Sequence, residues 1–184
     1  MLSHIRAVAV AAILLAVLGA CTAAQVETPD PAAIPSGEPV ARGGEPTGPV
    51  TVLGSGESSP GIGWRYLIYE SADGWCTELQ MSEVTSTGCG PDLLPAEGDH
   101  IGSAGALAPL ESGVTPVEGV VSNDIVTVMI IDEERGRLPA TLMPLDDAGL
   151  EGKAFLGFMP ADGTPTHIQA VAISGEILQT YELP

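Results

Sequence analysis

Short runs of apolar residues recur along the chain after residue 50, and turn-forming residues separate them. Each run is rich in β-branched or aromatic side chains, which is typical of β-strands. The pattern predicts strands at residues 63–70, 75–79, 124–132, 138–145, 153–160, 167–173 and 176–183.

Three connections between these runs carry hairpin signals. Asp73-Gly74 and Ser174-Gly175 lie between apolar runs, where a two-residue turn needs the positive φ that glycine tolerates. Residues 134–136 predict a longer hairpin loop. No 11-residue window in this part has helical apolar spacing free of Gly or Pro, so we expect few helices.

Residues 50–184 therefore predict a single all-β domain. About 135 residues are enough to bury a core, and strands of this length indicate an immunoglobulin-like β-sandwich of about seven to nine antiparallel strands. Trp64 and Trp75 lie in apolar strands, where we expect them to belong to the core.

The start of the chain has a different pattern. Arg6 precedes an unbroken apolar stretch from residue 7 to residue 20, which is the outline of an export signal. As a helix, this stretch would rise about 21 Å, which is short of the roughly 30 Å needed to span a membrane. We therefore expect residues 1–20 to be a cleaved signal peptide with a helical apolar part.

Residues Leu18, Gly19, Ala20 and Cys21 end this stretch and resemble the lipobox of bacterial lipoproteins. The resemblance implies that the Cys21 thiol receives diacylglycerol and becomes the first residue of the mature chain. It also implies a membrane partner, bound through the fatty chains. The alternative is an uncleaved anchor, which residues 22–24 would extend to 18 residues. Both interpretations place the rest of the chain on the extracytoplasmic side of the cell membrane.

Residues 21–49 follow as the lipidated cysteine and a segment rich in Pro, Gly, Ala, Glu and Thr. Such a segment buries too little apolar surface to fold, so we expect a disordered linker. Its reach would be about 30 Å as a coil and roughly 85 Å if extended.

Charge narrows the choice of partners. All 24 acidic residues but only five of the six basic residues lie beyond Ala20, so the mature chain carries a net charge of −19. Because phosphate binding depends on Lys and Arg, we expect no nucleic-acid partner. We expect an envelope protein or a cell-wall polymer instead.

Cys76 and Cys89 remain once Cys21 is lipidated. An even pair of cysteines in an oxidising compartment predicts a disulfide, here within one hairpin or its following loop. The neighbouring Trp75 is similar to the tryptophan packed on the immunoglobulin disulfide, but that disulfide joins two sheets across a much longer stretch of sequence.

The segments "GVVSNDIVTVMIID", "RLPATLMPL", "KAFLGFMP" and "IQAVAISGEIL" resemble a pattern found in uncharacterised exported β-domains of actinobacterial type. The resemblance brings no activity. It implies that residues 121–183 form a meander that makes up much of one sandwich.

Candidate catalytic residues are few. The mature chain holds two histidines, His100 and His167. Asp99 and Ser103 lie beside His100, but close neighbours in one strand point to opposite faces and cannot form a catalytic triad. We therefore assign no catalytic residue and expect a protein that is not an enzyme.

Metal binding is the sharper alternative, because acidic loops can supply the oxygen ligands that calcium prefers. The candidate ligands, which lack the spacing of a dedicated calcium loop, are Asp132, Glu133, Glu134, Asp146, Asp147 and Glu151. A zinc site would need the two thiolates of a pair that we expect to be oxidised. We expect Met129, Met143 and Met159 to fill the core rather than bind copper. No cofactor is predicted.

Together these observations predict a lipid-anchored extracytoplasmic binding or structural module of the bacterial cell envelope. The alternatives are a calcium-binding adhesion-type domain and an envelope hydrolase.

Overall fold

A computed structural model of the chain describes residues 37–58, 61–82 and 84–184. The predicted signal peptide, Cys21 and the first part of the predicted linker lie outside these residues. The described residues form twelve strands and one short 3-10 helix. The elements are β1 (Thr51–Glu57), β2 (Gly63–Ser71), β3 (Gly74–Met81), β4 (Thr85–Gly90), β5 (Ile101–Ala106), β6 (Val114–Val121), β7 (Ile125–Asp132), β8 (Gly136–Pro139), β9 (Thr141–Pro144), η1 (Asp146–Ala148), β10 (Lys153–Pro160), β11 (Pro165–Ala172) and β12 (Ile177–Glu182).

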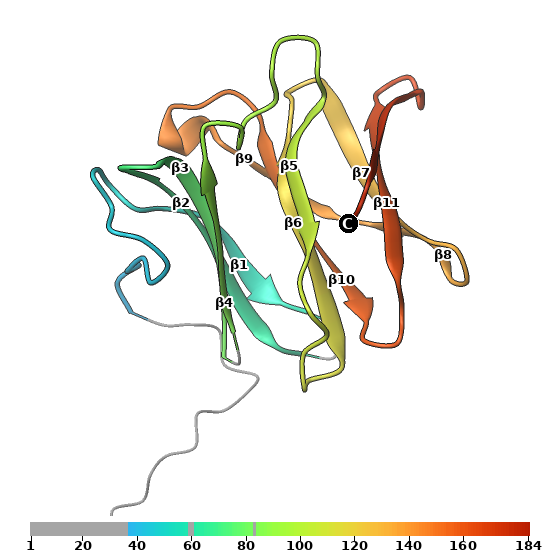
Figure 1. Ribbon diagram of the computed structural model, residues 1–184, viewed down its shortest axis with the longest axis horizontal. Helices are drawn as coiled ribbons and strands as arrows, with labels where there is room; N and C mark the ends of the chain where they lie inside the picture. Colours follow the sequence, from blue (N-terminus) through green and yellow to red (C-terminus); the bar gives the residue numbers. More distant parts are fainter. Residues whose placement is uncertain (1–36, 59–60, 83) are drawn as a thin grey trace, which may run out of the picture.

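The strands form three antiparallel sheets of four strands each. Sheet A has the order β1-β2-β3-β4, sheet B the order β5-β6-β10-β9, and sheet C the order β12-β11-β7-β8. The sheets lie as three successive layers, with sheet B in the middle (Figure 1). The predicted all-β sandwich is thus confirmed, with twelve strands rather than seven to nine.

Sheet B is buried on both faces. Along β6, Val114 and Val120 pack into a core shared with sheet A, whereas Val117 and Val121 pack into a core shared with sheet C. This split follows from the alternation of side chains along a strand. The two cores therefore share one sheet, and its strand β6 holds no exposed residue.

Strands β8 and β9 form one nearly continuous segment that passes from sheet C to sheet B. Ala140 lies between them and donates its N–H to the carbonyl of Val128 in sheet C, at 2.9 Å. The chain then returns from β10 in sheet B to β11 in sheet C. Residues 121–183 do make up much of the sandwich of sheets B and C, but the expected meander is wrong, because the chain changes sheet three times: from β6 to β7, from β8 to β9 and from β10 to β11.

Six of the seven predicted strands are present as single strands, and the seventh, 138–145, is divided between β8 and β9, which belong to different sheets. Four further strands were missed: β1, β4, β5 and β6. Strands β4 and β5 consist mainly of Gly, Ser, Thr and Ala, and β6 contains a proline and a glycine. Such residues make a strand difficult to predict from the sequence. In the folded protein, pairing with neighbouring strands holds these segments in the β conformation. The hairpin glycines Gly74, Gly136 and Gly175 all adopt the expected positive φ.

The predicted disulfide is present and joins Cys76 on β3 to Cys89 on β4. The two residues lie directly opposite one another in the β3–β4 ladder, with 4.1 Å between their Cα atoms. The bond therefore fixes the register of the edge strand β4 within sheet A. It is a hairpin disulfide, not the inter-sheet bond of immunoglobulin domains.

Residues 37–47, at the end of the predicted linker, lie against the outer face of sheet A. The carboxylate of Glu78 accepts the backbone N–H groups of Arg42, at 2.9 and 3.0 Å, and of Gly43, at 2.9 Å. Gln80 donates to the carbonyl of Val40 at 2.8 Å, and Arg65 donates to the carbonyl of Gly37 at 3.0 Å.

Glu78 and Gln80 are fully buried, and a buried polar side chain is costly unless it is hydrogen-bonded. The segment supplies part of that bonding, so it is a structural part of the domain. Its position beside sheet A is visible as the first coloured part of the chain (Figure 1).

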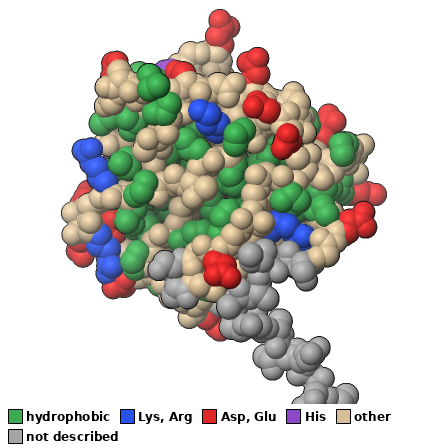
Figure 2. All heavy atoms as spheres, turned by 180° about the vertical axis from the view of Figure 1, so that it is seen from behind, with side chains coloured by type: hydrophobic (Ala, Val, Ile, Leu, Met, Phe, Trp, Pro, Cys, Tyr) green, Lys and Arg blue, Asp and Glu red, His purple; other side chains and the backbone are tan. Residues whose placement is uncertain are grey.

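The surface carries dispersed charge. On the face drawn in Figure 2, acidic side chains lie mostly around the margin and the basic ones form no continuous patch. Within the described part of the chain, no helix has the length and apolar character needed to cross a membrane.

The contact between Glu78 and residues 42 and 43 can be tested with the variant Glu78→Gln. We expect it to lower the free energy of unfolding by about 2 kcal/mol, because hydrogen bonds to a buried charged group are lost. We also expect faster hydrogen exchange at the amides of Arg42 and Gly43. Glu70→Gln, at an exposed position on β2, is the matched control. Unchanged exchange in Glu78→Gln would contradict the docking.

Candidate functional site

A crevice opens where the edge strand of sheet A meets the edge strand of sheet B. Its volume is about 200 Å³. Residues 86–88 of β4 line one wall, and residues 103–107 in and after β5 line the other. Thr77 of β3 and Glu118 of β6 belong to its lining as well.

The crevice exists because both edge strands lack large side chains. β4 has the sequence TSTGCG and β5 has the sequence IGSAGA. Gly105 lies directly opposite Glu118 in the ladder, so the two positions share a face of sheet B. No atom lies within 4 Å of the place where a Cβ on Gly105 would be. The space beside Glu118 is therefore open.

Glu118 occupies a position on β6 that faces sheet A, the face on which Val114 and Val120 are core residues. Its Oε1 accepts a hydrogen bond from the Ser86 hydroxyl at 3.0 Å. Its Oε2 is buried and has no hydrogen-bond partner. The hydroxyl of Tyr66, from β2, is also buried without a partner of ordinary geometry.

The surroundings of Glu118 change its acidity. Burial raises the pKa of Glu118 to about 7, against an ordinary value of 4.5, although the nearby hydroxyl groups of Ser86 and Tyr66 act in the opposite direction. Burial and the charge of Glu118 likewise raise the pKa of Tyr66. A carboxyl group that titrates near neutral pH inside a crevice is characteristic of a functional site.

A second compartment continues the crevice along the loop after β4. It has a volume of about 250 Å³ and shares Gly88 and Ser103 with the first. Residues 89–93 form the rest of its lining. A ligand that reaches Glu118 therefore has room to extend over this loop.

The acidic residues considered for calcium lie in two places. Asp132, Glu133 and Glu134 line one hollow of about 320 Å³, whereas Asp146, Asp147 and Glu151 lie between β9 and β10. Asp132 is buried, and its Oδ1 accepts the backbone N–H groups of Glu134, at 2.8 Å, and Arg135, at 3.0 Å. Its Oδ2 accepts that of Thr164 at 3.0 Å. Burial raises the pKa of Asp132, but these N–H donors outweigh it and hold the pKa below its ordinary value. Asp132 thus organises two turns.

The other acidic candidates are exposed: Glu133, Glu134, Asp146, Asp147 and Glu151. Asp146 and Asp147 form part of η1, between β9 and β10. Across the described ranges, no group of three or more His, Cys, Asp or Glu side chains is arranged to hold a metal ion.

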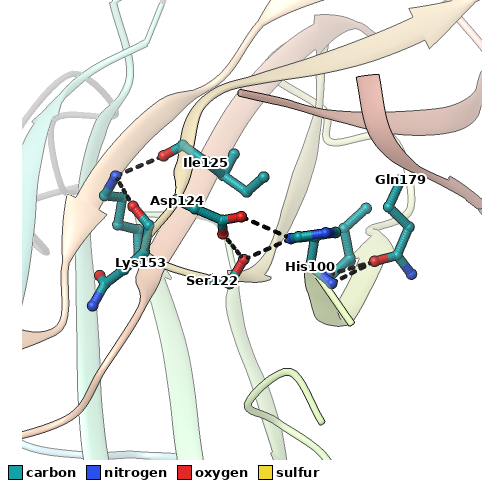
Figure 3. Close-up of polar contacts among 8 residues, drawn as sticks. His100, Ser122, Asp124, Ile125, Lys153 and Gln179 are labelled. Carbon is teal, nitrogen blue, oxygen red and sulfur yellow. Dashed lines mark hydrogen bonds and ion pairs between the residues drawn. The ribbon is translucent and has the colours of Figure 1, made fainter. Parts of the chain in front are cut away.

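A serine, a histidine and an aspartate do meet at the end of sheets B and C (Figure 3). His100 Nδ1 lies 3.1 Å from Asp124 Oδ2 and 3.3 Å from Ser122 Oγ. Ser122 donates its hydroxyl proton to Asp124 Oδ1. This bond and the contact with His100 hold the pKa of Asp124 below its ordinary value.

This arrangement differs from a catalytic triad. A triad uses one ring nitrogen of the histidine for the serine and the other for the carboxylate. Here both contacts use Nδ1, and the serine proton is directed to the carboxylate. The triad of Asp99, His100 and Ser103 that the sequence analysis rejected is not what forms here, because His100 contacts Ser122, Asp124 and Gln179.

The cluster instead joins the ends of several strands (Figure 3). Gln179 of β12 accepts the backbone N–H groups of His100, at 2.6 Å, and Ile101, at 2.9 Å. Lys153 of β10 donates to the carbonyls of Asn123, at 2.9 Å, and Ile125, at 2.6 Å. These bonds tie the β6–β7 turn and the start of β5 to their neighbours.

Sequence reasoning missed Glu118, Tyr66 and Ser86 as members of one site. The available signal was a lone acidic residue inside the apolar run "VTPVEGVV".

His167 lies on β11, where its Nδ1 is 2.9 Å from the hydroxyl of Thr166. Trp64, Met143 and Met159 are core residues as predicted.

Comparisons with protein-family models, with curated proteins and with solved structures find no match to this chain.

The acidity of Glu118 has a measurable consequence for stability. Below about pH 4.5 the carboxyl group is protonated in both states. Between there and about pH 7 the folded protein holds a proton that the unfolded chain releases, so the free energy of unfolding falls as pH rises. We expect a loss of about 3 kcal/mol over this range, from a shift of roughly two to three pKa units.

Denaturant unfolding from pH 4.5 to pH 8 measures this loss. We expect Glu118→Gln to remove it, whereas Glu176→Gln, at an exposed turn position, retains it. Equal pH dependence in the two variants would refute the assignment.

Proposed function

We propose that the protein is a lipid-anchored binding module at the extracytoplasmic face of a bacterial cell membrane, and that it binds its ligand in the crevice beside Glu118. The observation that carries this proposal is the carboxyl group of Glu118 at the base of an open crevice, whose buried Oε2 has no hydrogen-bond partner of ordinary geometry. Burial of a carboxylate at this position costs more free energy than burial of an apolar side chain. A ligand that completes the hydrogen bonding of the carboxylate explains why the position holds a glutamate.

The contents of the crevice favour binding over catalysis. Glu118 is the one acidic or basic side chain among the described residues that line its first compartment. Hydrolytic sites combine a nucleophile with a base and a group that orients it, or two carboxyl groups. Cys89, which lines the second compartment, forms the disulfide with Cys76 and therefore offers no thiol nucleophile. We therefore assign the crevice to recognition.

The anchor sets the reach of the module. Fifteen residues separate Cys21 from Gly37, where contacts with sheet A begin. Fully extended, they span at most about 50 Å. A domain attached at Cys21 would therefore meet partners close to the membrane, namely an envelope protein or a cell-wall polymer.

The anchor is tested with Cys21→Ser. We expect the variant to leave the membrane fraction, or to accumulate as an uncut precursor, because serine lacks the thiol that accepts the lipid. Cell fractionation and intact-mass measurement check this outcome. Thr22→Ser, one residue further along, is the control and should remain membrane-bound. An unsubstituted chain whose intact mass shows Met1 retained and the Cys21 thiol unmodified would indicate a spanning anchor instead.

The crevice is tested by a ligand screen on the purified full chain in detergent. We expect at least one class among monosaccharides, amino acids and aliphatic amines to perturb the amide resonances of Ser86, Ser103 and Gly105. Gly105→Leu fills the open space beside Glu118 and should abolish the perturbation. Gly48→Leu is the matched control, because Gly48 has open space around it, has no positive φ and does not line either compartment. Perturbations that survive Gly105→Leu, or none from any class, would contradict the proposal.

A further inference from the structure

The bonding around Glu118 specifies what a ligand must supply. Ser86 occupies Oε1 of the carboxylate, and Oε2 has no partner. Within the described linings of both compartments there is no lysine, arginine or histidine. An ionised carboxylate in this crevice therefore lacks a counter-ion from the protein. A positively charged hydrogen-bond donor on a ligand would supply both the missing counter-ion and the missing hydrogen bond of Glu118.

The free acceptors favour a compact cation over a planar one. A guanidinium group pairs best with both oxygens of a carboxylate at once. Here one oxygen is already bonded to Ser86. A primary ammonium has three donors around a point charge and needs only one carboxylate oxygen. The remaining donors have hydroxyl oxygens within the lining, namely those of Thr77, Thr87 and Ser103.

The rest of the crevice matches an aliphatic stem. Its walls near β5 carry Ala104, Ala106 and Leu107, and the second compartment adds Leu93. Apolar walls that end on a carboxylate suit a chain of methylene groups with a charged end. The combined crevice, about 200 Å³ and 250 Å³ in its two compartments, has room for such a chain and part of the molecule that bears it.

We propose that the crevice binds the primary ammonium group of an aliphatic amine, such as a lysine side chain carries, through an ion pair with Glu118. This inference rests on the proposed function and names the chemical class of its ligand. The strongly negative net charge of the chain, −18 overall, also attracts cations toward the surface.

Binding of an ammonium requires the ionised form of Glu118. The groups that face this carboxyl group are Tyr66 from β2 and Ser86 from β4, of which only Tyr66 titrates, and its pKa is raised. Since the pKa of Glu118 is about 7, the ionised fraction grows about tenfold between pH 6 and pH 8. Affinity for the amine should grow by the same factor.

The test uses n-butylammonium chloride as the probe and n-butanol as its uncharged counterpart. Titration of the purified full chain, followed by amide chemical shifts, measures the dissociation constant of each. We expect butylammonium to bind at least tenfold more tightly than butanol at pH 8, and about tenfold more weakly at pH 6 than at pH 8.

Two variants separate the carboxylate from the space around it. Glu118→Gln should weaken butylammonium binding at least tenfold at pH 8 and remove its pH dependence, whereas Glu176→Gln changes the net charge equally and should leave it unaltered. Gly105→Leu keeps Glu118 but should block the probe. Thermal melting confirms that each variant is folded. Loss of binding in Glu176→Gln, or retention in Glu118→Gln, would overturn the ion pair.

The outcomes also distinguish this inference from the proposed function. Butanol binding as tightly as butylammonium, or a monosaccharide binding in its place, would overturn the ammonium and leave a binding crevice. Failure of every compound would overturn both. Nα-acetyl-lysine amide, compared with cadaverine, distinguishes a lysine carried by a peptide from a free diamine.

Discussion

The architecture depends on the burial of sheet B on both of its faces. Its strands must place apolar side chains alternately toward sheet A and sheet C, and the packing leaves little spare room. Gly119 illustrates this, because a Cβ there would lie 2.6 Å from the ring of Phe155 and 2.3 Å from the carbonyl oxygen of Ser103. Gly157 is equally confined, with 2.2 Å to the side chain of Ile130. At these two positions of the middle sheet, a side chain could be added only if its neighbours moved.

Glu118 stands out against this constraint. It lies on the doubly buried sheet, yet at the point where β4 and β5 leave the space between sheets A and B open. A carboxylate deeper in the sheet would be surrounded by apolar side chains, and one further out would be fully hydrated. At this boundary, burial is sufficient to raise the pKa of Glu118 to about 7 while the group remains accessible from the crevice. The site is thus a product of how two sheets meet rather than of any loop.

The polar groups on the outer face of sheet A play a different part. Glu78 and Gln80 alternate with core residues along β3, so the strand pattern alone would place them in solvent. Residues 37–47 cover them and satisfy part of their bonding. If Cys21 carries the anchor, the same residues connect the membrane attachment to the face of the domain opposite sheet B. Attachment and ligand recognition would then lie on different sides of sheet A.

The amino-acid pattern by itself determined the all-β class, six of the strands, the hairpin glycines and the pairing of Cys76 with Cys89, because these features depend on local alternation, local turn geometry and a count of cysteines. It did not reveal β4, β5 or β6, whose small or irregular residues become strands only when neighbours supply the hydrogen bonds. Only the tertiary structure decided that Glu118 faces a crevice. The crevice lies between two sheets, and Ser86, which donates a hydrogen bond to Glu118, is 32 residues away in the chain. Likewise, the acidic residues that looked interchangeable in sequence differ in fact. Asp132 is buried and accepts backbone hydrogen bonds, whereas Glu133 and Glu134 are exposed. The packing of the sheets, not the residue type, determines which carboxylate is buried.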